Sequence, residues 1–370
     1  MPIRLSPKLR LRFRQAHMAV GLTAGLIVSL TGLTGASVAF RHEIDHALNP
    51  ALFRAPPAAV EAPVDRILAV AAENRGSPAT MVTFPREAGQ AYVVDLADGR
   101  EVFVDPAGER VLGERVADEA LMAVVLRLHR TLLAGEAGKV VVGGASLALL
   151  LLVLSGLVLR VPRRGPVRKR TARDWHELLG LWATATLAVS TITGATFAFK
   201  AQSIPAIAWL TRSEPVKPPK LPASEPVAMD TAQAVASARR LYPDGRVMAL
   251  RLPKEAGQPA RVDLKRAGDP HPYGRTWVWI APSDGRVVAT MAPEAAPRVH
   301  WLYTILNYPL HTGELWGLPG RVAMGLSGLT PAILFATGCW LFWKRNARRR
   351  RPAAPASAVV EPKEAVTPGV

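Results

Sequence analysis

The stretch that decides the fold is Arg12–Phe40, which reads RFRQAHMAVGLTAGLIVSLTGLTGASVAF. From Ala16 to Phe40 it contains no Asp, Glu, Lys or Arg. At a rise of about 1.5 Å per residue, a helix of this length crosses a hydrocarbon core of about 30 Å. The apolar run is longer than the roughly 7–15 residues of a signal-peptide core, so we expect it to be retained as a membrane helix.

Three further segments are long and apolar enough to cross a membrane: Val140–Leu159, Leu178–Phe199 and Val322–Trp343. Basic residues collect beside the four spans, at the N-terminus, in residues 160–173 and in residues 344–351. The positive-inside rule places these blocks in the cytoplasm and residues 41–138 and 200–320 outside, which in a bacterium is the periplasm. Membrane topology thereby explains the net charge of +17, and no nucleic-acid partner is expected.

The sequence predicts a membrane α-helical protein with four transmembrane helices and two periplasmic α+β lobes. Its segments are a basic cytoplasmic N-terminus (1–15), TM helix 1 (16–40), lobe 1 (41–138), TM helix 2 (139–160), a basic cytoplasmic loop (161–175), TM helix 3 (176–199), lobe 2 (200–320), TM helix 4 (321–343) and a disordered cytoplasmic tail (344–370).

Both outer segments follow the same order of elements. In the first, a helical pattern over Val64–Asn74 precedes the strand candidates MVTF, AYVVDL and EVFVD. In the second, a helical pattern over Asp230–Tyr242 precedes VMALRL, ARVDLK and TWVWIA. Asp98-Gly99 and Asp284-Gly285 are typical of hairpin turns. The repeated order indicates a duplication.

Two gapless shifts align the halves of the chain. A shift of 159 residues maps His17 onto His176 and Thr34-Gly35 onto Thr193-Gly194. A shift of 182 residues maps His129 onto His311 and Ser155-Gly156 onto Thr337-Gly338. The chain therefore reads as two copies of a helix–lobe–helix unit.

Four of the eight histidines lie at these duplicated positions. His17 and His176 open outward-running helices, so we expect both near the cytoplasmic face. His129 and His311 precede inward-running helices, so we expect both near the outer face. A pseudo-two-fold arrangement of the copies brings the members of each pair toward one another.

The residue types around the quartet favour haem iron over other metals. Carboxylates are scarce in the spans, which disfavours a proton relay or a hard-cation site. Structural zinc needs about four protein ligands, and no cluster completes such a set. Two facing imidazoles suit the axial positions of haem iron, each fixed by a hydrogen bond from its second nitrogen. Small residues supply space: Gly21 and Gly25 after His17, and Gly180 and Thr184 after His176.

We therefore predict two non-covalent b-type haems, because the chain has a single cysteine, Cys339, and no CxxCH motif. Alternatives remain: a histidine at a helix mouth is commonly an interfacial polar residue, and membrane glycines commonly serve helix packing. His42 and His46 are interpreted as surface histidines. His300 is interpreted as interface packing, with substrate or proton delivery as the alternative.

The chain resembles the PepSY-associated transmembrane helix family, which includes iron-regulated inner-membrane proteins and ferric-siderophore reductases. The motifs that carry the resemblance are AHMAVGLTAGL with TGLTGASVAFRHEIDHALNP, LHRTLLAGEAGK, DWHELLGLW and PLHTGELWGLPGR, within residues 10–345. The resemblance implies four membrane helices, two periplasmic PepSY-type lobes and b-type haem held by membrane histidines. It supports His17, His129, His176 and His311 as haem-iron ligands, without a definite pairing.

The first functional hypothesis is an inner-membrane di-haem oxidoreductase that reduces periplasmic ferric-siderophore iron. Some relatives append a flavin- or nicotinamide-binding domain that this chain lacks, so its electrons would come from another cytoplasmic protein or a quinol. The second is a haem-free regulatory or sensor protein whose PepSY-type lobes bind peptides or proteins. A third keeps the haems and sends electrons to another periplasmic acceptor. Besides donor and acceptor, the expected partner is the lipid bilayer.

Overall fold

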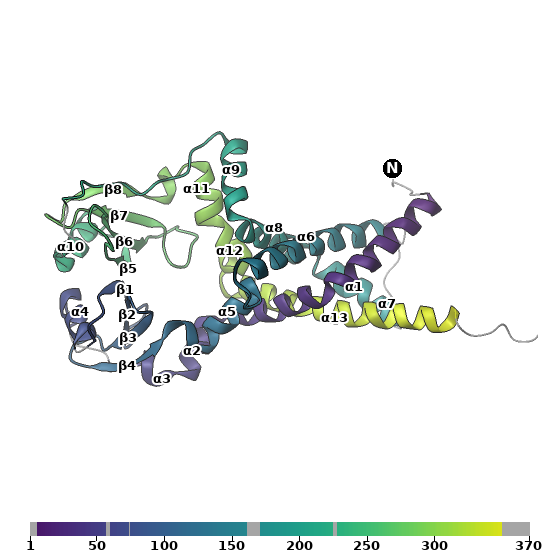
Figure 1. Ribbon diagram of the computed structural model, residues 1–370, viewed down its shortest axis with the longest axis horizontal. Coiled ribbons are helices and arrows are strands. Elements are labelled where there is room, and N and C mark those ends of the chain that lie inside the picture. The colour runs from purple at the N-terminus through teal and green to yellow at the C-terminus, as the bar shows by residue number, and fades with distance from the viewer. Residues whose placement is uncertain (1–5, 57–59, 74, 161–170, 225–227, 350–370) are drawn as a thin grey trace, which may run out of the picture.

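The structure, a computed structural model, describes residues 6–56, 60–73, 75–160, 171–224 and 228–349. A helical bundle forms one end of the molecule and a β-sheet domain forms the other (Figure 1). Residues 1–5 of the expected N-terminal segment, 161–170 of the expected basic loop and 350–370 of the expected tail lie outside the described residues.

The bundle contains the predicted membrane spans. Among the described residues, three helices are long and apolar enough to cross a membrane: α1 (Pro7–Val38), α6 (Gly135–Arg160) and α13 (Gly317–Arg349). A fourth candidate is the pair α7 (Ala172–Trp182) and α8 (Thr184–Ala198), which bend by 61° at the break between them. These helices are those of a multi-pass membrane protein.

The bend in the fourth candidate differs from the continuous helix expected over residues 176–199. Beside the break, the Thr184 hydroxyl donates to the Gly180 carbonyl oxygen at 2.7 Å. Bonds from a threonine side chain back to its own helix compete with the backbone ladder and often bend a helix. The apolar pattern of the sequence gives no sign of this competition, so it predicts a continuous helix.

The two copies interlock in the bundle. Helix α1 packs on α13, and α6 packs on α8, so each span of one copy contacts the opposite span of the other. At the α1–α13 crossing, a Cβ added at Gly328 would lie 2.7 Å from the Gly32 carbonyl oxygen. Small residues of this kind let membrane helices approach closely.

The two outer segments share one sheet. Its eight antiparallel strands run in the order β4-β3-β2-β1-β5-β6-β7-β8. The first copy supplies β1 (Ala79–Thr83), β2 (Tyr92–Leu96), β3 (Arg100–Val104) and β4 (Val111–Val116), and the second supplies β5 (Arg246–Arg251), β6 (Ala260–Lys265), β7 (Thr276–Ile280) and β8 (Val287–Met291). The halves join where β1 pairs with β5, with Val82 opposite Leu250.

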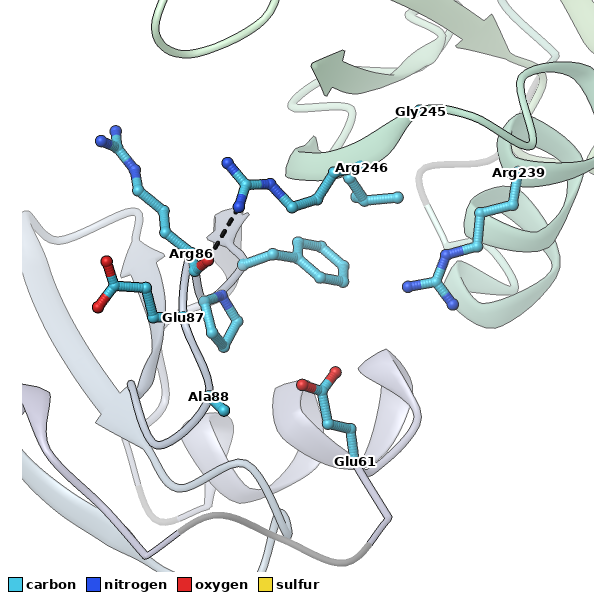
Figure 2. A pocket seen from close by; sticks show the side chains of 10 residues that line it. Glu61, Arg86, Glu87, Ala88, Arg239, Gly245 and Arg246 are labelled. Carbon is cyan, nitrogen blue, oxygen red and sulfur yellow. Dashed lines mark hydrogen bonds between the residues drawn. The ribbon is translucent and has the colours of Figure 1, made fainter. Parts of the chain in front are cut away.

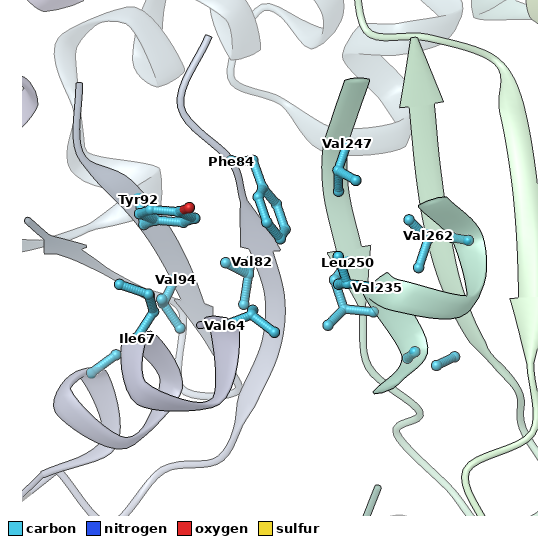
Figure 3. Close-up of a cluster of buried hydrophobic side chains, with 14 of the residues drawn as sticks. Val64, Ile67, Val82, Phe84, Tyr92, Val94, Val235, Val247, Leu250 and Val262 are labelled. Atoms are coloured by element: carbon cyan, nitrogen blue, oxygen red, sulfur yellow. The ribbon is translucent and has the colours of Figure 1, made fainter. Parts of the chain in front are cut away.

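One apolar core extends across this joint. Helix α4 (Val64–Ala72) covers the first half and α10 (Thr231–Leu241) covers the second (Figure 3). Ile67 from α4 and the facing strand residues Val82 and Leu250 are completely buried. Burying apolar surface from both halves in one cluster stabilises the sheet domain as a unit rather than as two independent lobes.

Short helices connect the sheet domain to the bundle. They are α2 (Arg41–Leu48), α3 (Pro50–Phe53), α5 (Leu121–Thr131), α9 (Lys200–Thr211), α11 (Arg298–His300), a π-helical turn (Trp301–Leu306) and α12 (Asn307–Thr312). Two of them, α5 and α12, carry His129 and His311.

Candidate functional site

The structure brings the four duplicated histidines together as two pairs. His17 of α1 faces His176 of α7, with ring centres 6.4 Å apart and ring planes at 77°. His129 of α5 faces His311 of α12, with ring centres 6.2 Å apart and planes at 49°. Each pair joins equivalent residues of the two copies. We call them the inner pair (His17, His176) and the outer pair (His129, His311).

A hydroxyl group on a neighbouring helix holds each histidine through Nδ1. The four contacts are His17 with Ser155 Oγ (2.8 Å), His176 with Thr337 Oγ1 (2.9 Å), His311 with Thr193 Oγ1 (2.8 Å) and His129 with Thr34 Oγ1 (3.3 Å). His129 Nδ1 also donates to the Thr31 carbonyl oxygen at 2.9 Å. These contacts fix the position of each ring from its Nδ1 side.

These contacts determine the tautomer of the rings. A hydroxyl has one proton, and Ser155 donates it to the Leu151 carbonyl oxygen at 2.6 Å, so its oxygen accepts from His17 Nδ1–H. The other three hydroxyls bond in the same way: Thr337 to Ile333, Thr193 to Val189 and Thr34 to Leu30. Each histidine thus carries its proton on Nδ1 and keeps a lone pair on Nε2, the nitrogen through which it can bind a metal.

A glycine follows each of the four hydroxyl residues and lies against the histidine ring. A Cβ added at Gly35 would lie 2.9 Å from His129 Cε1, and one added at Gly194 would lie 3.4 Å from His311 Cε1. At the inner pair the corresponding distances are longer. A Cβ added at Gly156 would lie 3.5 Å from His17 Cε1, and one added at Gly338 would lie 3.9 Å from His176 Cε1. The repeated hydroxyl–glycine dipeptide is therefore a cradle for each imidazole.

The glycines expected to make space beside the inner pair have different neighbours. A Cβ at Gly25 would overlap the ring of Phe335, so Gly25 serves the contact of α1 with α13. Added Cβ atoms at Gly21 and Gly180 would make ordinary contacts, at 3.7 Å to Leu152 and 3.9 Å to Leu334. A side chain at these two positions would thus meet ordinary contacts, whereas one at Gly25 would collide with Phe335.

The donor set restricts the metal chemistry of the pairs. Among the described residues, no group of three or more His, Cys, Asp or Glu side chains is placed to hold a metal ion. Each pair therefore offers two nitrogen ligands and no carboxylate or thiolate. A closed tetrahedral site of four protein ligands has no counterpart in this part of the chain.

The family model described as the PepSY-associated TM region matches residues 14–345. The chain belongs to the PepSY-associated TM region family. No curated protein matches the chain. Family membership agrees with the resemblance found in the motifs and covers both histidine pairs and the sheet domain.

In this family member, a polar cluster lies between the sheet and the outer pair. The Tyr273 hydroxyl contacts Arg41 Nη2 at 2.8 Å, His42 Nε2 at 2.5 Å and the Tyr308 hydroxyl at 3.4 Å. Tyr308 lies on α12, three residues before His311. Burial and the positive charges of Arg41 and Arg86 lower the pKa of His42 to about 3, so this histidine is neutral.

The remaining histidines pack inside the sheet domain or against it. His46 stacks on Phe53 with ring centres 4.0 Å apart, and buried His271 bonds to Arg275 at 2.6 Å. His300 is buried edge-on against Trp277, and burial lowers its pKa to about 4. The structure thus places His300 in packing, and His42 in the polar cluster rather than on an open surface.

The hydroxyl residues and Thr31 were not among the site residues expected from the sequence. The signal for the hydroxyl residues was present, because Thr34-Gly35, Ser155-Gly156 and their duplicates are among the matched positions. A matched hydroxyl in a membrane span indicates a shared polar partner, and the histidines are duplicated under the same two shifts. Thr31 acts through its carbonyl oxygen, which no side-chain pattern reveals.

Proposed function

We propose that the protein is a bacterial inner-membrane di-haem b oxidoreductase that reduces the iron of periplasmic ferric siderophores. The observation that carries the proposal is the two histidine pairs, each with Nδ1 bonded to a hydroxyl and Nε2 free to bind iron. Among the described residues, no group offers a hydrogen bond to these Nε2 atoms. The family, which includes ferric-siderophore reductases, supplies the substrate class.

The spacing of each pair would let both of its histidines hold one iron between them. With metal–imidazole bonds of about 2 Å on each side, the two ring centres lie roughly 6 Å apart. The separations of 6.4 Å and 6.2 Å support this arrangement at both ends of the bundle. His17 and His176 would hold one haem, and His129 and His311 the other.

When bound, haem supplies a one-electron couple whose potential depends on its ligands and surroundings. The protein's part is to hold four neutral imidazoles in fixed orientation. The hydroxyls of Ser155, Thr337, Thr193 and Thr34 accept from Nδ1 and increase the basicity of Nε2. The adjacent glycines let the edge of each ring approach the neighbouring helix closely. No acid–base step on the substrate is required.

Charge supports an orientation with the inner pair at the cytoplasmic face. Arg10, Arg12 and Arg14 precede His17 on α1, and Arg10 donates to the Leu159 carbonyl oxygen at the end of α6. Basic residues of this kind stay on the cytoplasmic side. Electrons would enter at the inner pair from a cytoplasmic protein or a quinol and leave at the outer pair, beside the periplasmic sheet domain.

The direct test is the absorption spectrum of protein purified from haem-replete cells. We expect a reducible b-type spectrum that is diminished by alanine at each of the four histidines. His46→Ala is the control, because His46 is a histidine stacked on Phe53 outside both pairs.

A colourless preparation would contradict the proposal and favour the haem-free peptide-binding alternative. A haem-containing protein that fails to reduce any ferric siderophore would instead favour the electron-carrier alternative, in which the acceptor is another periplasmic metal ion or redox protein. A reduction assay with ferric siderophore separates these two results.

A further inference from the structure

A hollow of about 290 Å³ lies where the two halves of the sheet domain meet. The loop after β1 lines one side, with Arg86, Glu87 and Ala88, and the start of β5 and helix α10 line the other, with Arg246 and Arg239 (Figure 2). Phe84 and Val247 add apolar wall. Because the hollow is built from both copies of the repeat, it exists only in the joined sheet.

The hollow carries a surplus of positive charge, and its arginines form no ion pairs among the described residues. Among the described residues, no carboxylate lies within 4.0 Å of the guanidinium nitrogens of Arg86, Arg239 or Arg246. The two carboxylates on the wall are engaged by neutral groups: Glu61 accepts from the Tyr92 hydroxyl at 3.1 Å and Glu87 accepts from Gln90 at 3.2 Å. The three arginines outnumber the two glutamates of the lining and form no ion pair with them, which favours an anion with oxygen acceptors.

A chain of contacts leads from the hollow to the helix that carries His311. The Arg86 guanidinium carbon lies 4.6 Å from the centre of the Tyr273 ring. The hydroxyl of Tyr273 accepts from Arg41 and contacts the hydroxyl of Tyr308, which lies on the helix of His311. Arg41 itself has no carboxylate within 4.0 Å among the residues described. The positive region therefore extends from the hollow toward the outer pair.

We infer that this hollow binds the ferric chelate through its negatively charged oxygens, so that the substrate class is anionic: carboxylate or catecholate chelates rather than neutral or cationic hydroxamates. The inference rests on the proposed function for the identity of the iron chelate. A haem held at the outer pair would supply the one electron that converts Fe(III) to Fe(II), while the chelate keeps its atoms. Binding sites for small ligands are commonly about 300–1,000 Å³, so the hollow receives one edge of a chelate.

The test measures binding without electron transfer. Gallium(III) has the charge of ferric iron and is not reduced, so the probes are gallium(III) complexes of a tris-catecholate and of a tris-hydroxamate. We expect the full chain in detergent to bind the tris-catecholate complex at least about tenfold more tightly, and less tightly as salt is raised. Arg239→Gln and Arg86→Gln should each weaken this binding by about tenfold.

Arg240→Gln is the matched control, because Arg240 is the neighbour of Arg239 on α10 and does not line the hollow. It should change binding by less than about twofold. Equal binding of the two complexes, absence of binding, or an Arg240→Gln effect as large as that of Arg239→Gln would overturn the inference. Since gallium binding needs no haem, a haem-free preparation that still binds the tris-catecholate would remove the proposed reductase function and retain the anion site.

Discussion

The inner and outer histidine pairs share one design and differ in how tightly the protein surrounds them. At the inner pair, His17 and His176 lie on the spanning helices; His17 contacts one hydroxyl, and His176 contacts a hydroxyl and the Leu334 backbone. At the outer pair, the histidines lie on the short helices α5 and α12, and both have a backbone partner as well, Thr31 for His129 and Ser190 for His311. His311 also meets Phe197 with ring centres 5.5 Å apart.

The difference indicates two roles. The outer pair is fixed from more sides and lies on the elements that lead into the sheet domain, where the polar cluster around Tyr273 begins. The inner pair is held by fewer contacts and lies beside the basic end of α1. A tightly held outer site suits transfer to a bound substrate, because fixed ligands limit reorganisation on electron transfer.

The largest expected effect comes from removing one histidine of either pair. His17→Ala and His129→Ala should each lower the haem content of the purified protein by about half, because each removes a proposed ligand from one of the two proposed haems. The measurement is haem per chain by pyridine haemochrome assay. If both variants kept the full content, neither pair would be a haem site.

A smaller effect distinguishes the pairs through their hydroxyls. Ser155→Ala removes the hydroxyl that His17 Nδ1 contacts, whereas Thr34→Ala leaves His129 the Thr31 carbonyl oxygen at 2.9 Å. Loss of such a partner typically weakens metal binding by about 10–100-fold, so we expect this for Ser155→Ala and much less for Thr34→Ala. The check is the rate of haem transfer to an apo-globin acceptor. Equal rates for the two variants would show that the carbonyl bond does not support the outer ring.

A third comparison uses the glycine cradles. The new Cβ of Gly35→Ala would lie 2.9 Å from His129 Cε1, so the ring must move, at a cost of about 1–3 kcal/mol. The new Cβ of Gly156→Ala would lie 3.5 Å from His17 Cε1, which is ordinary contact. Thermal unfolding and the low-spin signals of ferric haem should change for the first variant and stay near wild type for the second. The opposite order would contradict the tighter outer site.

The smallest expected effect is a pH dependence of stability that comes from the buried histidines His42 and His300. Burial is the main cause that lowers the pKa of His42 to about 3 and of His300 to about 4 in the folded protein, against about 6.5 unfolded. The unfolded chain therefore takes up protons first, so the stability these groups contribute is complete above about pH 6.5 and is lost as the pH falls toward their folded pKa values. Between pH 7.5 and pH 6 we expect the melting temperature to fall by a few degrees.

The matched control for this pH dependence is the variant His300→Phe. It replaces a buried ring whose Nε2 has no hydrogen-bond partner among the described residues, so it should reduce the pH dependence while keeping the packing on Trp277. A melting temperature that rises on acidification in this range would contradict the assignment of these histidines as buried and neutral.

The sequence predicted the spans and the pairing of the four histidines because both follow from patterns that are visible along the chain itself. Apolar runs report membrane helices, and the gapless shifts of 159 and 182 residues report equivalent positions. The helices α4 and α10 and the turns at Gly99 and Gly285, both with positive φ, also follow from local signals.

Other features depend on contacts between distant segments. The joint between β1 and β5 unites strands of different copies, and no local pattern specifies that Val82 pairs with Leu250. The edge strands β4 and β8 are largely unburied and so lack the apolar alternation that marked the others. The arginines of the hollow come from two distant segments, with Arg86 in one and Arg239 and Arg246 in the other, and each is typical of a surface charge when taken alone.

The measurement that tests the central claim most directly is haem stoichiometry in the two pair-deletion variants, His17→Ala/His176→Ala and His129→Ala/His311→Ala. The account predicts about two haems per chain in the wild-type protein and one in each variant, with a different redox potential for the haem that remains. A wild-type protein without haem, or variants that retain both haems, would contradict it.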